Sequence, residues 1–244
     1  AAVQLMASKV LAIPKEYVKY FNISFETNSP SYYPLECCLV NQLAYIVGED
    51  VLFDSTINSN NNFKDKFIEL TNYKSFMAIQ DNIDKILMAE EEIIKINNKI
   101  VQIDDRNKKV DNMIKKIDSL KKQITSTFIR TQNLITTSYF DKAFLAINDL
   151  ESVENYRRKL YNFKDYLGAT DGYTFFNDYY VDKMMDLEDK YNLLENNASV
   201  TSASMYLVKK KTSRIMAFFR YIKSLFIHNS LKNKDFENEN DFNK

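Results

Sequence analysis

Side chains that commonly carry enzyme chemistry are few in this 244-residue chain, and their spacing does not assemble a site. The single histidine, His228, excludes a metal centre built from several histidines and leaves no convincing catalytic triad. Cys37 and Cys38 are adjacent and have no activating partner near them in sequence, so we expect both to be buried structural residues. We therefore predict no cofactor, no metal and no enzymatic activity.

Glycines and carboxylates support the same prediction. The three glycines, Gly48, Gly168 and Gly172, are too scattered for a phosphate-binding loop or a dinucleotide fingerprint. The carboxylate clusters at 90–92 and 104–105 contain residue types used in acid–base chemistry. A solvated helix face explains such runs better, so we expect these carboxylates to be exposed.

Charge and cysteine usage restrict the class of partner and the compartment. Thirty-three basic and thirty-three acidic residues cancel, which argues against a nucleic-acid partner. Neighbouring cysteines rarely bridge each other, and without a disulfide framework a reducing compartment is favoured. There is no run of about 18 apolar residues that would span a membrane. The expected location is intracellular, in the cytoplasm or on the cytoplasmic face of a membrane.

One segment carries a functional hint, the stretch from Ala203 to Ser230. It holds six basic residues and no acidic one, with apolar residues on one helical face. A basic amphipathic helix is typical of membrane-surface or acidic-partner binding, and equally of the last helix of a bundle. The residues expected to contact an anionic membrane or acidic partner are Lys209, Lys210, Lys211, Arg214, Phe218, Phe219, Arg220, Ile222 and Lys223.

Composition predicts an all-α fold. The chain has only three Gly and three Pro, whereas sheet-rich proteins of this length need many more turn residues. Hydrophobic residues make up 45%, enough for a real core. The abundant Lys, Asn, Ile, Tyr and Phe all have AT-rich codons, which indicates an AT-rich genome and carries no functional message.

The most regular feature is a heptad seam from Ile79 to Phe128. Apolar positions recur with a spacing of three and then four residues, which is typical of a coiled-coil or bundle helix. Such a long helix needs a partner helix to cover its seam. The residues expected at that interface are Ile96, Ile100, Ile103, Asn107, Val110, Ile114 and Ile117.

Two coverings of the seam remain open. The flanking charges permit a parallel self-pair, in which Lys99 would face Asp104, and Asn107 would set the register. An antiparallel self-pair would place aspartates against each other. Met113 and Leu120 widen the apolar face instead, which suits a helix covered by the second half of its own chain.

These observations predict an all-α chain in which a long coiled-coil-like helix packs with a helical bundle beside a small helical N-terminal piece. The expected parts are an N-terminal helical piece at 1–52, a polar loop at 53–62, the coiled-coil helix at 63–137, a helical bundle at 138–229 and a flexible tail at 230–244. Within the first part, helices are expected at 9–21 and 35–46. The expected function is that of a non-enzymatic scaffold or tethering subunit with protein partners. The alternative is a peripheral membrane-binding protein that uses the basic helix at 205–228.

Overall fold

A computed structural model of the protein describes residues 1–103 and 108–201. Residues 1–195 form one compact unit. In this part the chain is almost entirely helical, and its single sheet has two strands. The elements in chain order are α1 (Ala2–Val10), β1 (Glu16–Tyr20), β2 (Ile23–Thr27), α2 (Pro34–Val47), α3 (Glu49–Asn58), α4 (Asn62–Leu70), α5 (Tyr73–Val101), α6 (Lys108–Leu145), α7 (Leu150–Phe163), a 3-10 turn (Lys164–Tyr166) and α8 (Phe175–Thr201).

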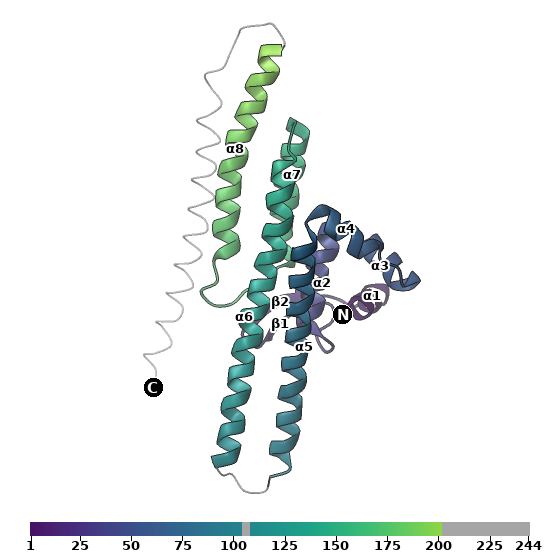
Figure 1. The fold of residues 1–244 in the computed structure, drawn as a ribbon, viewed down its shortest axis with the longest axis vertical. Coiled ribbons are helices and arrows are strands. Elements are labelled where there is room, and N and C mark those ends of the chain that lie inside the picture. Colours follow the sequence, from purple (N-terminus) through teal and green to yellow (C-terminus); the bar gives the residue numbers. More distant parts are fainter. Residues whose placement is uncertain (104–107, 202–244) are drawn as a thin grey trace. The chain divides into compact units, whose positions relative to one another are not determined.

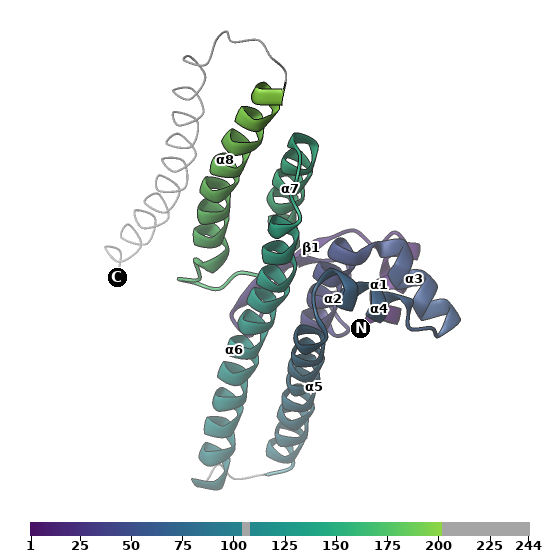
Figure 2. The same ribbon diagram turned by 45° about the horizontal axis from the view of Figure 1, so that its top comes forward.

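The longest feature is the helical hairpin, the antiparallel pair of α5 and α6, which lie side by side in Figures 1 and 2. Its seam is the predicted heptad pattern: Ile86 and Phe128 are completely buried, and Ile93 and Ile117 nearly so. Polar contacts also cross the hairpin, where the Arg130 guanidinium donates to the Asn82 amide oxygen at 2.8 Å. The seam therefore covers itself, because its part on α5 packs against its part on α6. The covering is intramolecular, as one of the two expectations had it, but it comes from the seam and not from the second half of the chain.

The prediction of one continuous helix over 63–137 is wrong, because this stretch contains three helices. The first break is at Leu70–Asn72, where the Asn72 side chain accepts a hydrogen bond from the Ser75 N–H and caps α5. The second lies between Val101 and Lys108, where the chain reverses. The heptad spacing continues through that reversal. The pattern therefore predicted which positions are buried, but it did not predict that the chain turns back on itself there.

The expected helix over 9–21 is also wrong, because α1 ends at Val10 and a β-hairpin follows. The strands β1 and β2 pair antiparallel, with Val18 opposite Phe25. Burial along β2 alternates, with Ile23, Phe25 and Thr27 inside, which is the period of a half-buried strand. The expected helix over 35–46 is confirmed by α2.

The polar loop expected at 53–62 is much shorter in the structure, because α3 continues to Asn58 and α4 begins at Asn62. Local hydrogen bonds close the turn. The Asp54 carboxylate accepts from the amides of Asn58 at 2.7 Å and Asn60 at 3.2 Å. In the sequence these asparagines suggest an irregular loop. In the structure their side chains make hydrogen bonds that close a tight connection between α3 and α4.

The remaining helices pack through aromatic rings. A capping box formed by Asp149 and Ser152 starts α7. Phe163 at its end is fully buried, and its ring lies 5.3 Å from that of Phe140 and 6.2 Å from that of Phe176, measured between centroids. These contacts join α6, α7 and α8 into the bundle that the sequence predicted for the region after 138.

A buried polar network ties the segment after α7 to the N-terminal elements. The Gln132 side chain both accepts from the Gly168 N–H and donates to the Gly168 carbonyl, each at 2.8 Å. The Gln42 amide donates to Gln132 at 3.0 Å, and Ser24 and Ala169 exchange two backbone bonds. Residues from α2, β2, α6 and the segment after α7 thus share one hydrogen-bonded junction.

Candidate functional site

The structure brings the predicted seam residues together inside the helical hairpin. Three of them, Ile96, Val110 and Ile117, are buried, whereas Ile100, Ile103 and Ile114 are half-buried. Asn107 lies outside the described residues. Their contact with a partner protein, including a parallel self-pair, stays a prediction.

The basic segment expected to bind an anionic surface lies outside the described residues, and so does His228. The sites that can be built from side-chain geometry are therefore in residues 1–196. Within this range no helix combines the length and the apolar character needed to cross a bilayer.

Cys37 and Cys38 are buried free thiols, as the sequence predicted. Burial raises the pKa of Cys38 to about 12 and also raises the pKa of Cys37. Because the thiolate is the nucleophile, both thiols are poorly reactive at neutral pH. Their polar contacts are weak ones, such as that from the Cys38 sulfur to the Tyr166 carbonyl at 3.6 Å. Both cysteines are core residues.

Sequence reasoning missed a buried pair of carboxyl groups, Glu36 and Glu90. Glu36 stands near the start of α2 and is 0% exposed, while Glu90 comes from the middle of α5 and is half-buried. Neither oxygen of Glu36 receives a hydrogen bond from a donor within the part of the chain that the structure describes. The two carboxyls lie close enough that the negative charge of Glu36 contributes to the raised pKa of Glu90.

Burial and like charge determine the protonation of this pair. Burial is the main cause that raises the pKa of Glu90 to about 8, followed by the negative charge of Glu36. Burial likewise raises the pKa of Glu36, and the amino group at Ala1 slightly opposes this shift. The Tyr20 hydroxyl lies next to Glu90, and burial raises its pKa to about 12. At neutral pH Glu90 is therefore mostly protonated, with a neutral tyrosine beside it.

A protonated carboxyl beside an ionised one is an arrangement used in acid–base catalysis. Here the completely buried Glu36 is sealed from any substrate, so the pair is a buried acidic contact between α2 and α5. One sequence signal marks Glu36, a single acid within the apolar run from Leu35 to Val40. No sequence signal marked Glu90, which lies in the acidic run 90–92 that was expected to be exposed. Glu91 is exposed, but for Glu90 the expectation is wrong, because this residue turns inward and is half-buried.

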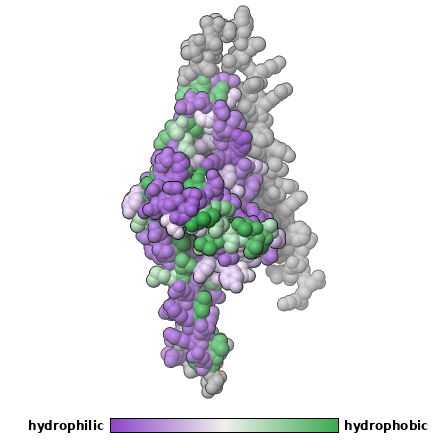
Figure 3. Space-filling view, turned by 90° about the vertical axis from the view of Figure 1, so that its right-hand side faces the viewer, coloured by the Kyte–Doolittle hydropathy of each residue, from purple (hydrophilic) through white to green (hydrophobic). Residues whose placement is uncertain are grey.

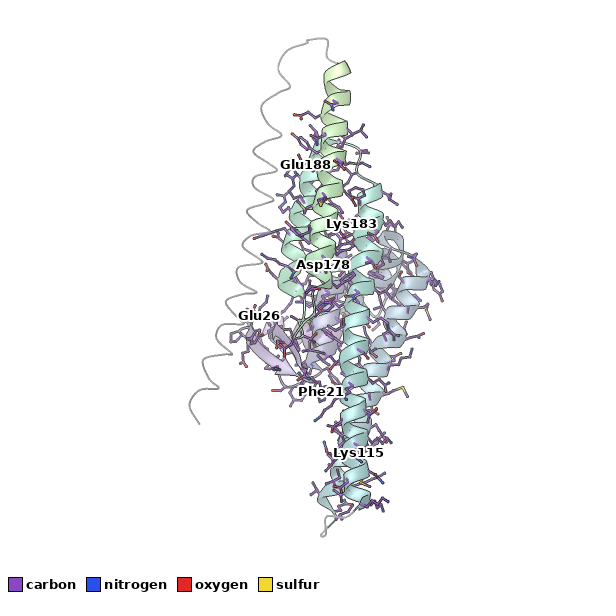
Figure 4. The ribbon with its side chains drawn as sticks, turned by 90° about the vertical axis from the view of Figure 1, so that its left-hand side faces the viewer. Phe21, Glu26, Lys115, Asp178, Lys183 and Glu188 are labelled. Atoms are coloured by element: carbon purple, nitrogen blue, oxygen red, sulfur yellow. The ribbon has the colours of Figure 1, made fainter. Side chains whose placement is uncertain are left out.

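A second site lies at the turn between β1 and β2. Phe21 and Asn22 have φ values of 47° and 67°, a left-handed conformation that is unfavourable for a bulky aromatic residue. The Thr125 hydroxyl on α6 contacts the Phe21 carbonyl at 2.6 Å and holds the turn against the helix. Figure 4 shows Phe21 beside α6, with Lys115 on the same helix in this view. An open pocket of about 710 Å³ lies here between the turn and α6.

A third site is the outward face of α1. Leu5 and Ser8 are buried on its inner face, while Val3, Val10 and Leu11 are 64%, 74% and 72% exposed. In Figure 3 a hydrophobic patch is visible on the side of the molecule where α1 and α3 lie. Because exposed apolar patches on soluble proteins often mark interaction sites, this face is a candidate for partner binding.

The described residues contain no group of three or more His, Cys, Asp and Glu side chains placed to hold a metal ion. Comparison of the chain with family models, with curated proteins and with solved structures found no match.

Proposed function

We propose that this protein is a non-enzymatic α-helical scaffold or tethering subunit that acts through contacts with another protein. The observation that carries the proposal is the outward apolar face of α1, formed by Val3, Val10 and Leu11. Ile13, just after the helix, extends it and is partly exposed. A helix that is apolar on both sides normally has both sides covered.

The orientation of α1 supports this proposal, because its inner face is firmly anchored. Leu5 packs in a buried cluster with Cys37, Ala44 and Leu52. Lys9 forms an ion pair with Glu49 at the start of α3. Rotation of the helix to hide Val3 and Val10 would expose Leu5, so these valines stay on the surface until a partner covers them.

The partner chemistry follows from the residues of the face. Val3, Val10 and Leu11 carry no charge, and Lys9 is already paired with Glu49. A complementary surface would present apolar side chains at its centre and polar groups at its rim, as protein interfaces usually do. The proposed partner is thus a protein with an exposed apolar groove or helix face.

Site-specific photo-crosslinking tests this proposal. A photo-reactive amino acid at Val10, in the full chain expressed in its natural host, is expected to give a crosslinked species of defined mass. The same probe at Lys74, an exposed polar position on α5, serves as the control and is expected to give none. Adding Val3→Ser and Leu11→Ser should abolish the Val10 product without altering the circular dichroism spectrum.

The result that would overturn the proposal is a Val10 probe that yields only uncrosslinked protein, or the same products as the Lys74 probe. A product with twice the mass of the 28.7 kDa chain would identify a second copy as the partner. Size-exclusion chromatography with light scattering then measures the oligomeric state.

A second candidate function, peripheral membrane binding, rests on the basic segment at 205–228. Its supporting observation is the charge pattern, with six basic residues and no acidic one between Ala203 and Ser230. Flotation with anionic vesicles is the test. Replacing residues 209–211 with Gln should reduce binding by about 1 kcal/mol for each lysine near the surface. Absence of flotation at low salt would reject this candidate.

A further inference from the structure

The pocket between the β1–β2 turn and α6 has a positive lining. Lys19 comes from β1, and Lys121 and Lys122 come from α6. Asp118 is the one acidic residue in the lining. No ion pair occupies any of the three lysines within the described part of the chain. Three ammonium groups against one carboxylate leave the pocket with a surplus of positive charge.

The hydrogen-bonding capacity of the lining also favours an anion. The Thr125 hydroxyl bonds to backbone carbonyls of Phe21 and Lys121, and the Ser126 hydroxyl donates to the Gln123 carbonyl at 3.0 Å. These hydroxyls are therefore engaged. The donors that remain for a ligand are the three ammonium groups and the exposed Asn22 amide.

Two features fix the shape of the pocket: the backbone conformation of the β1–β2 turn and the contact of this turn with α6. The left-handed region is unfavourable for most non-glycine residues, and Phe21 and Asn22 both adopt it. The Thr125 contact and the packing of the Phe21 ring, 4.2 Å from that of Tyr20 between centroids, keep this turn in place. Positive φ at both positions is what a two-residue β-hairpin turn requires, so the pairing of β1 with β2 fixes the turn in this shape. Lys121 and Lys122 are on a long helix, so both walls of the pocket are pre-organised.

We propose that this pocket binds a ligand that carries two or more phosphate groups. Lys19, Lys121 and Lys122 would contact the phosphate oxygens, and the Phe21 ring would line the same cavity. Lysine is a strongly hydrated point charge well suited to phosphate, and three of them exceed what one singly charged carboxylate can neutralise. Phosphates of this kind occur on small soluble molecules and on the headgroups of phosphorylated lipids.

The test uses the full chain with two probes, inorganic pyrophosphate and phosphatidylcholine vesicles that contain phosphatidylinositol bisphosphate. Calorimetry or sedimentation is expected to show saturable binding that weakens as salt rises. Backbone NMR shifts should change at 19–22 and 118–126. Saturation by pyrophosphate identifies a soluble phosphate ligand, and saturation by vesicles alone identifies a lipid headgroup.

Matched variants locate the site. The double variant K121Q/K122Q is expected to bind at least tenfold more weakly. The control K74Q/K85Q removes the same charge from exposed positions of α5 outside the lining and should bind like the parent. Asp118→Asn should tighten binding several-fold, because it removes the opposing carboxylate. Circular dichroism melting checks that each variant is folded.

The proposal is overturned if neither probe binds saturably, or if the pocket and control variants weaken binding equally. It is also overturned if Asp118→Asn leaves the affinity of a binding probe unchanged. Because the surface of α1 is not involved, loss of this proposal would leave the proposed protein contact intact.

Discussion

The helical hairpin and the N-terminal body (residues 1–70) bury their residues in different ways. Over residues 79–96 of α5 and 110–124 of α6, the interior of the hairpin consists mostly of isoleucines repeated at heptad spacing, with Asn82 as a polar member that is bonded to Arg130. In the N-terminal body, polar side chains such as Glu36 and Gln42 are completely buried. The hairpin thus owes its stability mainly to apolar area, and the body needs specific polar partners as well.

This difference indicates which kind of substitution destabilises each region. An apolar seam tolerates conservative change at any one position but not a charge. The polar junctions of the body depend on contacts between distant parts of the chain, such as that of Gln42 with Gln132. Removing one partner there leaves the other buried without a hydrogen bond, which is costly. The predictions that follow test this comparison.

The largest effect is expected from a charge in the hairpin seam. Ile86→Asp should lower the free energy of unfolding by about 3–5 kcal/mol, because Ile86 is 0% exposed and the carboxylate would have no partner. Ile94→Asp on the same helix is the control. That residue is 59% exposed, so its change should stay within about 0.5 kcal/mol. Urea unfolding of both variants measures the difference, and equal costs would show that the seam is not a packing surface.

A smaller loss is expected from a single methyl group at the junction of the body with α6. In Gly168→Ala the new Cβ would lie 2.8 Å from the Phe128 ring and 3.0 Å from Ile23, so rigid neighbours must move. Overpacking of this kind costs about 2 kcal/mol.

The matched control for the junction is Gly172→Ala, where no atom lies within 4 Å of the added Cβ. Its positive φ of 76° leaves a conformational cost of about 1 kcal/mol. Thermal or urea unfolding should rank Gly168→Ala as the more destabilising change. The reverse order would mean that this junction is loosely packed.

The carboxyl pair predicts a pH dependence of stability. Glu90 has a pKa of about 8 in the folded protein and an ordinary, lower value when unfolded. Between pH 5 and 8 the folded state therefore retains a proton that the unfolded chain has released, so the free energy of unfolding falls as pH rises. Above about pH 8 the decrease should level off.

Glu90→Gln keeps the shape of the protonated acid and removes this titration. Near pH 9 the variant should be more stable than the parent by about 1–2 kcal/mol, a value reduced for the partial exposure of Glu90, and the gain should shrink toward pH 5. Glu91→Gln, at an exposed neighbouring position, should follow the parent. Urea titrations at several pH values provide the measurement. A pH-independent gain would mean that Glu90 does not retain its proton in the folded protein.

The smallest effect is expected on the outward face of α1. Val10→Ser should change the free energy of unfolding by no more than about 0.5 kcal/mol, because the Val10 side chain is 74% exposed in the isolated chain. Leu5→Ser on the inner face should cost several times more. If Val10→Ser is as damaging as Leu5→Ser, the outward face is a hidden part of the core and not a surface for a partner.

Sequence alone determined the helical class and the positions that the hairpin buries. A helix places residues three and four apart on one face, so the spacing of apolar residues along the chain predicts which of them are buried. This rule identified Ile79, Ile86, Ile93 and their counterparts on α6. The helix at 35–46 and the exposed Glu91 followed from the same local rules.

Only the tertiary structure decided where the chain reverses and which distant residues meet. The heptad spacing runs through 102–107 without a break, so it cannot distinguish one long helix from two that fold back. The strands β1 and β2 are five residues each, too short for their period to outweigh the helical context. Glu36 lies near Glu90, and Lys19 lies near Lys121 and Lys122, only because α2, β1, α5 and α6 converge. Such sites arise from contacts between distant residues, which have no period along the chain.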